Sequence, residues 1–431
     1  MTQTPHPLSS ISSGKKQVIA SVADLAAAAG DPDIQTIIVT GDLRDVPAIR
    51  LAPGTTLLGS ASERPSLRFV PDTDGLCLSM NNTVANLDLI AGADRCALLN
   101  DDSVSTLGTL TLRSVNTVGR VRILVRGNIR SGHVEAENLD IVFADARGAQ
   151  DRPHAYGVDV LQGAFTLWNM QPDADVVITA NLSGLSAGRL AAPVRGTGVF
   201  VGGAGESGGR LEIQILRTGP IYSNGGIEAG TAGIIAGGVF VVYGSRVDLV
   251  DNAGPVTTYG PNDMALDNWG VVDRWISSGK VTTFGPSGVG FVNFGVINSL
   301  RVTAPIETFG QGARGFNVYT GTVRSADFDR IVTHGDGAVG VQISQPAGTL
   351  IFRRGIETHG SIGDSLVKGV VKQLAANALS IKPGGSAESI RIEGGLRTHG
   401  HSAIPLEQEG TIQSLHIDGG LSCAASPEGA A

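Results

Sequence analysis

Hydrophobic and polar residues alternate with a period of two along most of the chain, as in the segment SLRVTAPIET at 299–308. Glycines and Gly-Pro pairs interrupt this alternation at short intervals. A period of two places successive side chains on opposite faces of a strand, and the glycines mark turns between strands. A helical period occurs only at 19–29, IASVADLAAAA. The pattern predicts an all-β protein of short strands with one helix near the N-terminus.

A five-residue motif recurs in the second half of the chain, in the forms VTTYG, VTTFG, IETFG, IVTHG and IETHG. Each copy ends in a glycine, and successive glycines are 25 residues apart: Gly260, Gly285, Gly310, Gly335 and Gly360. A fixed step of this length is typical of a solenoid. The repeat predicts a parallel β-helix with coils of about 25 residues, stacked about 4.8 Å apart.

The next glycine of this series, Gly400, follows after 40 residues. This coil therefore carries an insertion of 15 residues, at about 368–382. We expect an extra strand or a short helix there, which shapes a groove wall or a subunit contact.

The N-terminal segments resemble the first coils of pectate-lyase-like right-handed β-helix proteins. The resemblance rests on the helical segment 19–29 and on LAPGTTLLGS (51–60) and NNTVANLDLI (81–90). It implies a right-handed β-helix capped by the N-terminal helix, and a leaning toward carbohydrates. Neither the polygalacturonase nor the pectate lyase catalytic set occurs, so it implies no catalytic residue. We expect an N-terminal segment and cap over 1–50, a β-helix over 51–420 and a tail over 421–431.

Within each motif, alternation assigns side chains to the inside or the outside of the coil. The β-branched residue and the threonine two positions later are expected to face inward, with the threonine hydroxyls bonding along the stack. The residue between them and the ring before the glycine face outward. In the next strand, Asn268 falls over Asn293, which predicts an internal asparagine ladder that satisfies a turn.

The outward ring positions form a column of one asparagine, three aromatic residues and three histidines: Asn224, Tyr259, Phe284, Phe309, His334, His359 and His399. Such a row of exposed rings can stack on sugar rings, or it can pack under a loop or against another subunit. The histidines are candidates for acid–base work or metal binding. No third ligand is expected on the same face, although Asp336 and His401 lie just past the corner, so we expect no metal site.

Composition and charge disfavour several classes of binding partner and of functional site. A net charge of −8 and a charged fraction of 17% disfavour nucleic acid and anionic membranes as partners. Three widely spaced cysteines indicate neither disulfides nor a structural zinc site. No secretion signal, membrane span, nucleotide motif or serine-hydrolase motif is recognisable. We therefore expect a cytoplasmic protein without cofactors. Its low surface charge favours a homo-oligomer, with a trimer preferred.

Three segments depart from the repeat, at 143–160, 222–239 and 259–275, and solenoids tend to carry function at such places. The second and third follow the same corner in successive coils. We therefore predict that Glu228, Asp263 and Asp267 converge on one cleft as catalytic carboxylates. The predicted substrate-binding residues surround them or belong to the outward columns: Tyr222, Tyr259, Trp269, Arg274, Phe284, Glu307 and His334. The alternative for each of these polar side chains is a turn that caps backbone groups.

Carboxylates beside aromatic rings are what glycosyl chemistry requires. The sequence therefore predicts a carbohydrate-active enzyme that cleaves, transfers or rearranges glycosidic bonds of an oligo- or polysaccharide. The alternative is a non-catalytic β-helix, an adhesin-like or scaffold protein whose exposed rings form an interface.

Overall fold

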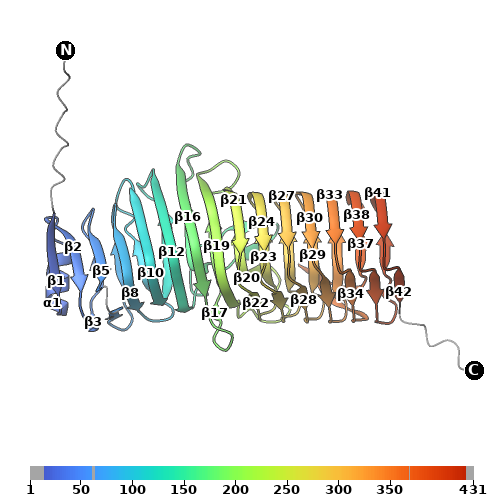
Figure 1. Cartoon of the computed structure of the whole chain (residues 1–431), viewed down its shortest axis with the longest axis horizontal. Helices are drawn as coiled ribbons and strands as arrows, with labels where there is room; N and C mark the ends of the chain where they lie inside the picture. The colour runs from blue at the N-terminus through green and yellow to red at the C-terminus, as the bar shows by residue number, and fades with distance from the viewer. Residues whose placement is uncertain (1–13, 61–63, 368, 424–431) are drawn as a thin grey trace, which may run out of the picture.

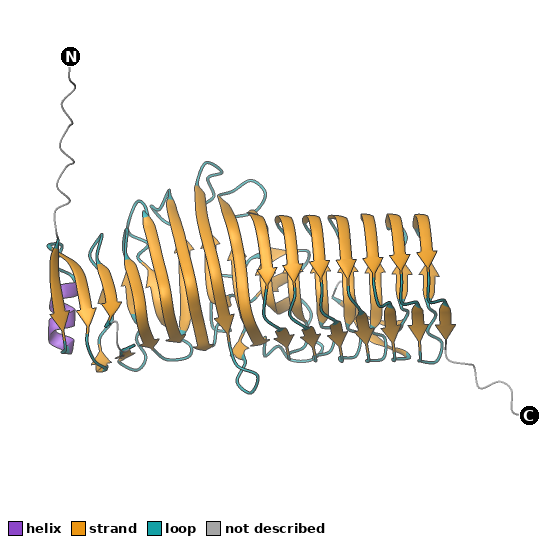
Figure 2. Cartoon of the chain, in the orientation of Figure 1, coloured by secondary structure: helices purple, strands orange, loops and turns teal. Residues whose placement is uncertain are grey.

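The protein is a right-handed parallel β-helix, as predicted. A computed structural model describes residues 14–60, 64–367 and 369–423. The coils follow one another along a single axis, with the first and last coils at opposite ends of the molecule (Figure 1). Strands make up nearly the whole fold (Figure 2). The strands form three parallel ladders, and each complete coil of the C-terminal half contributes one strand to each ladder.

The first ladder holds the longest strands: β1 (Lys15–Ile19), β2 (Ile34–Val39), β5 (Thr56–Gly59), β8 (Thr83–Ile90), β10 (Thr109–Val118), β12 (Gly132–Phe143), β16 (Val177–Ala187), β19 (Arg210–Asn224), β21 (Ser245–Asn252), β24 (Val271–Ser277), β27 (Val296–Val302), β30 (Thr322–Phe328), β33 (Pro346–Phe352), β38 (Ser386–Ile392) and β41 (Thr411–Ile417).

The second ladder holds short strands, most of which precede a corner glycine: β3 (Leu43–Val46), β6 (Ser66–Phe69), β17 (Val194–Arg195), β22 (Val256–Thr258), β25 (Val281–Thr283), β28 (Ile306–Thr308), β31 (Ile331–Thr333), β34 (Ile356–Thr358), β39 (Leu396–Thr398) and β42 (Leu421–Cys423). The third ladder lies after the corner: β4 (Ile49–Arg50), β7 (Leu76–Leu78), β9 (Cys96–Asn100), β11 (Arg120–Val125), β15 (Gly163–Asn169), β18 (Thr197–Gly202), β20 (Ile234–Val241), β23 (Asp263–Asn268), β26 (Val289–Asn293), β29 (Arg314–Val318), β32 (Val339–Ile343), β37 (Leu379–Ile381) and β40 (Leu406–Gln408).

Two antiparallel hairpins depart from the coil pattern. The first consists of β13 (His154–Ala155) and β14 (Val158–Val160), and β14 also pairs with β20 of the third ladder. The second consists of β35 (Ile362–Val367) and β36 (Val370–Ala375). It accounts for the insertion expected at 368–382, although it begins earlier in the sequence.

The predicted 25-residue register is confirmed in the second ladder, where Val256, Val281 and Ile306 pair directly. The inward threonines are buried as expected, but the predicted bonding of their hydroxyls along the stack is wrong. The hydroxyls of Thr333 and Thr398 donate to backbone carbonyls five residues further on, within their own coils. The hydroxyls of Thr258, Thr283 and Thr308 have no hydrogen-bond partner among the described residues.

The corner glycines are required because successive coils approach closely there. A Cβ atom on Gly360 would lie 1.8 Å from the carbonyl oxygen of Gly335, and one on Gly400 would lie 1.8 Å from that of Gly360. No real side-chain carbon tolerates such a distance from a backbone atom. The regular spacing of glycine within the repeat is therefore a steric consequence of coil stacking.

Helix α1 (Val22–Ala29) forms within the helical segment expected at 19–29. Its N-cap residue, Ser21, accepts a hydrogen bond from the backbone N–H of Asp24. Leu25, Ala28 and Ala29 are buried in the main hydrophobic core. That the helix closes the end of the core stays a prediction. Among the described residues no helix has the length and hydropathy needed to cross a membrane.

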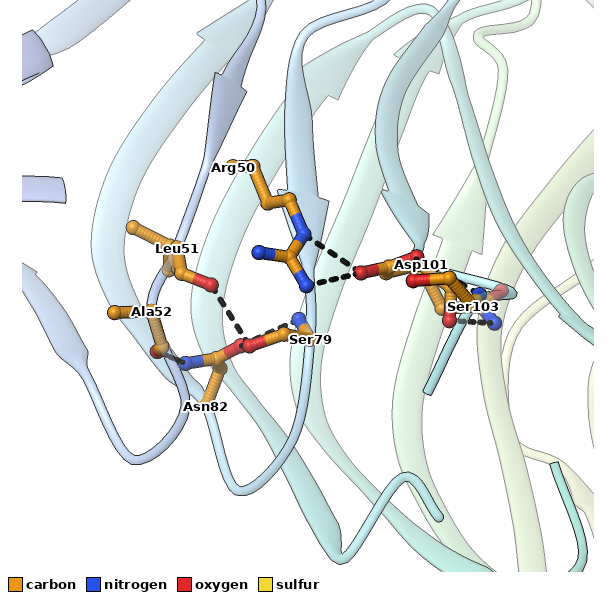
Figure 3. A network of polar contacts seen from close by, with 8 residues as sticks. Arg50, Leu51, Ala52, Ser79, Asn82, Asp101 and Ser103 are labelled. Atoms are coloured by element: carbon orange, nitrogen blue, oxygen red, sulfur yellow. Dashed lines mark hydrogen bonds and ion pairs between the residues drawn. The ribbon is translucent and has the colours of Figure 1, made fainter. Parts of the chain in front are cut away.

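Buried polar side chains connect the first coils (Figure 3). The side-chain amide of Asn82, in the segment NNTVANLDLI, donates to the carbonyl oxygens of Ala52 at 2.8 Å and Thr55 at 3.1 Å. Its own oxygen accepts the backbone N–H of Ser79 at 2.7 Å. At the surface of these coils, Arg50 Nε donates to Asp101 at 2.6 Å. Asn82 therefore joins one turn to the turn of the preceding coil.

Strand stacking begins at β1 and ends at β42, so the ladders extend from Lys15 to Cys423. The N-terminal residues 1–13, in which no secretion signal is recognised, lie outside the described residues, as does most of the tail expected over 421–431.

Candidate functional site

Six outward rings form one continuous stack on the surface, which we call the ring column: Tyr259, Phe284, Phe309, His334, His359 and His399. Neighbouring ring centroids are 4.5–5.5 Å apart and the planes of neighbouring rings lie within 13° of one another. The ladder spacing imposes this geometry, because the same position in each coil repeats along the axis.

The ring column presents ring edges to solvent rather than ring faces. Phe284 is 44% exposed and Phe309 is 38% exposed, yet each ring is covered on both faces by its neighbours in the stack. At the start of the column, the Tyr259 hydroxyl donates to the carbonyl oxygen of Leu190 at 3.2 Å. Stacking on a sugar uses a ring face, so the inner rings of the column offer no platform for it.

The outward glutamates beside the ring column are engaged in ion pairs. Glu307 lies 2.9 Å from His334 Nε2 and also pairs with Lys280. Burial acts to raise the pKa of Glu307, but the hydrogen bonds from Lys280 and His334 outweigh it and hold the pKa below its usual value. Glu307 is therefore ionised at neutral pH. In this state it can accept a proton or a hydrogen bond, but it cannot donate a proton.

Asp263 lies at a coil corner and binds backbone amides. Its carboxylate accepts the backbone N–H of Gly260 at 2.7 Å and that of Gly225 at 3.1 Å. The residue is fully buried. Burial raises the pKa of Asp263 to about 7, despite the amide donors. The carboxylate thus caps backbone amides of two successive coils. This is the capping role that the sequence offers as the alternative to a catalytic one.

Asp267 lies four residues further along β23, in a cluster of aromatic side chains. It sits opposite Phe240 of β20 and Val292 of β26, and it is fully buried. Neither carboxylate oxygen has a hydrogen-bond partner among the described residues. Burial raises the pKa of Asp267 well above its usual value, against weaker effects of Trp269 and the Asn268 amide. Burial therefore favours the neutral form of the Asp267 carboxyl group.

Tyr156 covers this cluster from the tip of the first hairpin. Its ring stacks on Phe294 with centroids 4.6 Å apart and meets the edge of Trp269 at 5.1 Å. Tyr156 and Gly157 both have positive φ angles, 55° and 81°, as a two-residue hairpin turn of type I′ requires. A tyrosine is an unusual residue in this backbone region. Packing of its ring over Trp269 and Phe294 accounts for its place there.

The structure does not bring the three predicted catalytic carboxylates into one pocket. Asp263 binds the corner amides, Asp267 is buried opposite Phe240, and Glu228 is exposed in the loop after β19. Trp269 is only 4% exposed and packs in the aromatic cluster. Of the other predicted binding residues, Tyr259 and Phe284 stack on each other, Glu307 contacts His334, Tyr222 pairs with Thr257, and Arg274 is exposed on β24.

A pocket lies on the outer side of the third ladder, and the roughly 640 Å³ of space around it includes the open solvent at its mouth. The first hairpin lines it with Tyr156, and the second hairpin lines it with Leu366. The second hairpin is thus the groove wall expected of the insertion. We call this hollow the Arg314 pocket. Its other lining residues come mainly from the ladder and its turns: Val158, Ile235, Asn262, Met264, Ser287, Val289, Val292, Phe294, Arg314, Asn317, Tyr319 and Gly369.

Arg314 is a buried cation without an acidic partner. The residue is 4% exposed, and among residues 14–60, 64–367 and 369–423 it takes part in no ion pair. Its guanidinium makes two long hydrogen bonds of 3.4 Å, to Gln342 Oε1 and to the carbonyl oxygen of Gly312. Burial lowers the pKa of Arg314 to about 10, which still leaves it charged at pH 7.

Asn317, three residues later on β29, contributes a second unsatisfied group. It is 2% exposed, and its Oδ1 atom has no hydrogen-bond partner in the part of the chain that the structure describes. The pocket thus combines a charged donor and a neutral acceptor with walls of aromatic and aliphatic side chains. Small-molecule sites of proteins have this kind of composition.

None of the ten predicted site residues lines the Arg314 pocket. Arg314 itself left a signal in the sequence, because it occupies the position that Val289 and Val339 hold in the neighbouring coils. A charged residue in an apolar column of a solenoid strand marks a departure from the repeat. Tyr156 and Asn262 belong to the irregular segments noted in the sequence, but nothing in the sequence joins them to Arg314.

Comparisons of the chain with protein-family models, with curated proteins and with solved structures give no match.

Proposed function

We propose that this protein binds an acidic saccharide in the Arg314 pocket. The observation that carries the proposal is the buried guanidinium of Arg314, which has no carboxylate partner and lies in a pocket with aromatic walls. A buried, unpaired charge is costly to a folded protein. The carboxylate of a bound ligand supplies the missing partner, in the two-pronged geometry that guanidinium and carboxylate groups share.

A sugar acid matches the rest of the pocket. Its ring hydroxyls can donate to Asn317 Oδ1, and its apolar ring face can pack on the side chains of Phe294 and Tyr319. The likeness of the first coils to the pectate-lyase-like superfamily supports a saccharide over other organic anions. That support is an analogy of fold, whereas the support for an anion comes from Arg314 itself.

Calorimetric titration with acidic oligosaccharides, and with neutral ones of the same length, tests the proposal. We expect the acidic ligands to bind at least ten times more tightly than the neutral ones. Arg314→Met should remove this preference and leave the weak neutral binding unchanged. Arg301→Met, an exposed arginine on β27, is the matched control and should bind like the wild type.

Two results contradict the proposal. One is that no acidic saccharide in a broad panel binds. The other is that Arg314→Met, with an unchanged circular dichroism spectrum, binds the acidic ligand as tightly as the wild type. Asn317→Leu provides a second variant, which should weaken binding of both kinds of ligand because it removes an uncharged acceptor.

A carbohydrate-active enzyme is the second candidate, and the buried carboxyl group of Asp267, whose pKa is raised, favours it. A general acid must carry its proton at working pH, and burial raises the pKa of Asp267 in the direction that this role requires. Asp267 is fully buried and does not line the pocket, so proton transfer to a bound ligand requires a local movement that exposes it. Asp263 and Glu228 remain catalytic candidates with weaker support, since one binds backbone amides and the other is outside the pocket.

Assays of glycan turnover separate the enzyme from the non-catalytic binding protein. For an enzyme that uses Asp267, Asp267→Asn abolishes turnover and leaves binding of the acidic saccharide intact. If the wild type binds the saccharide and turns over no glycan in the panel, the non-catalytic alternative holds.

A further inference from the structure

Three potential metal ligands converge beside the end of the ring column. His399 Nε2 lies 3.0 Å from Glu357 Oε1, and His359 Nε2 lies 3.2 Å from the same oxygen. One ligand atom from each residue lies within 4.8 Å of the other two. Glu357 and His359 belong to the motif IETHG, and His399 belongs to the equivalent motif in the next coil.

We propose that Glu357, His359 and His399 form a binding site for a divalent transition-metal ion, with Zn²⁺ as the ion that fits best. Two imidazole nitrogens and one carboxylate oxygen are ligands that Zn²⁺ prefers. Three protein ligands leave one position of a tetrahedral ion open to water or to a ligand group. The site is separate from the Arg314 pocket and does not depend on the function proposed for it.

The surroundings of the site allow an ion to enter. The side chains of His359 and His399 are 37% and 49% exposed, so their rings can turn toward an ion without a change in the backbone. Arg330 pairs with the other carboxylate oxygen, Glu357 Oε2. This contact leaves Oε1 to the histidines and fixes the orientation of the carboxylate, as hydrogen bonds from outside the ligand set do in known metal sites.

The sequence predicts no third ligand on the face of the histidines and offers only Asp336 and His401, just past the corner, as possible contributors. The structure places Glu357, which precedes the corner, within reach of both histidines. The ladder explains why: residues two apart on a strand point to the same side, and the next coil adds its own side chain about 4.8 Å away.

The same chain contains an incomplete copy of the site two coils earlier. Glu307 occupies the position of Glu357, and His334 from the next coil lies 2.9 Å from it. The position of His359 is held by Phe309, which cannot bind a metal ion. The incomplete copy serves as an internal control, because it lacks one ligand. Replacing Phe309 by histidine is expected to turn it into a second metal site.

Zn²⁺ alone, titrated into the tag-free full chain at pH 7.5 against a chromogenic chelator, tests the proposal. We expect one tightly bound ion per chain. Glu357→Gln, His359→Gln and His399→Gln should each weaken binding at least tenfold, and His401→Gln should not. Co²⁺ in place of Zn²⁺ should give the visible absorption of a four-coordinate ion in the wild type and lose it in the three variants. Circular dichroism checks that each variant is folded.

Phe309→His gives the converse test, because it completes the second set of ligands around Glu307 and His334. We expect its stoichiometry to rise from one ion per chain to two. The proposal is overturned if the wild type shows no saturable binding, or if His399→Gln binds Zn²⁺ like the wild type. A stoichiometry of one in folded Phe309→His contradicts the geometric rule on which the site is built.

Discussion

The side-chain amide of Asn268 donates to the side-chain oxygen of Asn293 at 2.8 Å, across two successive coils. Both residues are fully buried. The amide of Asn293 in turn donates to the carbonyl oxygens of Gly295 at 3.0 Å and Thr322 at 3.1 Å. The internal asparagine ladder predicted from the repeat is thus confirmed, and it satisfies turn carbonyls in consecutive coils.

Replacement of Asn293 by alanine should destabilise the protein. It leaves the Asn268 amide and the carbonyl of Thr322 with fewer partners in the interior, where each unsatisfied polar group costs about 1–3 kcal/mol. We expect a clear fall in the thermal midpoint, measured by circular dichroism. Asn298→Ala is the control, since Asn298 is exposed and its side-chain amide donates to Asp273 at 2.9 Å, and its effect should stay within about 0.5 kcal/mol. Equal midpoints for the two variants contradict the ladder's role.

Phe309 holds the middle of the ring column, with ring centroids 5.0 Å from Phe284 and 4.6 Å from His334. Phe309→Ala interrupts the stack on both sides, and each lost ring pair is worth about 0.5–1.5 kcal/mol. We expect a larger drop in thermal midpoint than for Ile404→Ala, which removes an exposed apolar side chain outside the column. A column that contributes nothing to stability would give the two variants the same midpoint.

The homo-oligomer, with a trimer preferred, stays a prediction, and the ring column offers its test. The exposed edges of Phe284 and Phe309 are apolar surface that a subunit contact would cover. Under this hypothesis, sedimentation of the wild type gives the mass of a trimer, and Phe284→Ser combined with Phe309→Ser gives that of a monomer. A wild type that sediments at 44.3 kDa removes the hypothesis.

Gly360 ends the motif IETHG, and alanine at this corner should disrupt the stacking of coils. Its Cβ atom would lie 1.8 Å from the carbonyl oxygen of Gly335, which the ladder cannot move without breaking its register. We expect Gly360→Ala to lower the thermal midpoint strongly or to prevent folding. Gly148→Ala is the matched control, because nothing lies within 4 Å of a Cβ atom there. If both variants melt like the wild type, the corner glycines are not steric requirements.

The fold could be predicted because the same residue types recur at equivalent positions of successive coils. The glycine step of 25, the inward Ile356 and Thr358, and the stacked Asn268 and Asn293 each follow from one rule, that equivalent positions lie above one another. A single motif says little, whereas its repetition fixes register, direction and side-chain orientation together.

The pocket could not be predicted in the same way, because its walls come from outside the repeat. The hairpins that contribute Tyr156 and Leu366 fold back onto the third ladder, and no periodic pattern specifies how far they reach. The same limit applies to Asp267. The sequence predicts that it lines one cleft with Asp263 and Glu228, but its side chain is fully buried opposite Phe240. Arg314 alone was detectable, as a charge in an apolar column.

Asp263 should make stability depend on pH in a direction opposite to that of most carboxylates. Its pKa is 3.8 in an ordinary environment and about 7 in the fold, because burial disfavours the charged form. Between these values the folded chain holds a proton that the unfolded chain has released, so stability falls as pH rises from about 4 to about 7. At 1.36 kcal/mol per pH unit the full effect is at most about 4 kcal/mol.

Asp263→Asn isolates this contribution, since asparagine cannot ionise and all other carboxylates titrate alike in both proteins. The stability of the wild type relative to Asp263→Asn should decline as pH rises from 4 to 7.5, measured by thermal midpoints at matched ionic strength. Asp248→Asn, an exposed residue on β21, should show no such trend. A constant difference would mean that the amides of Gly225 and Gly260 hold Asp263 ionised in the fold. That outcome would make the corner a preformed anion site rather than the place of a buried neutral acid.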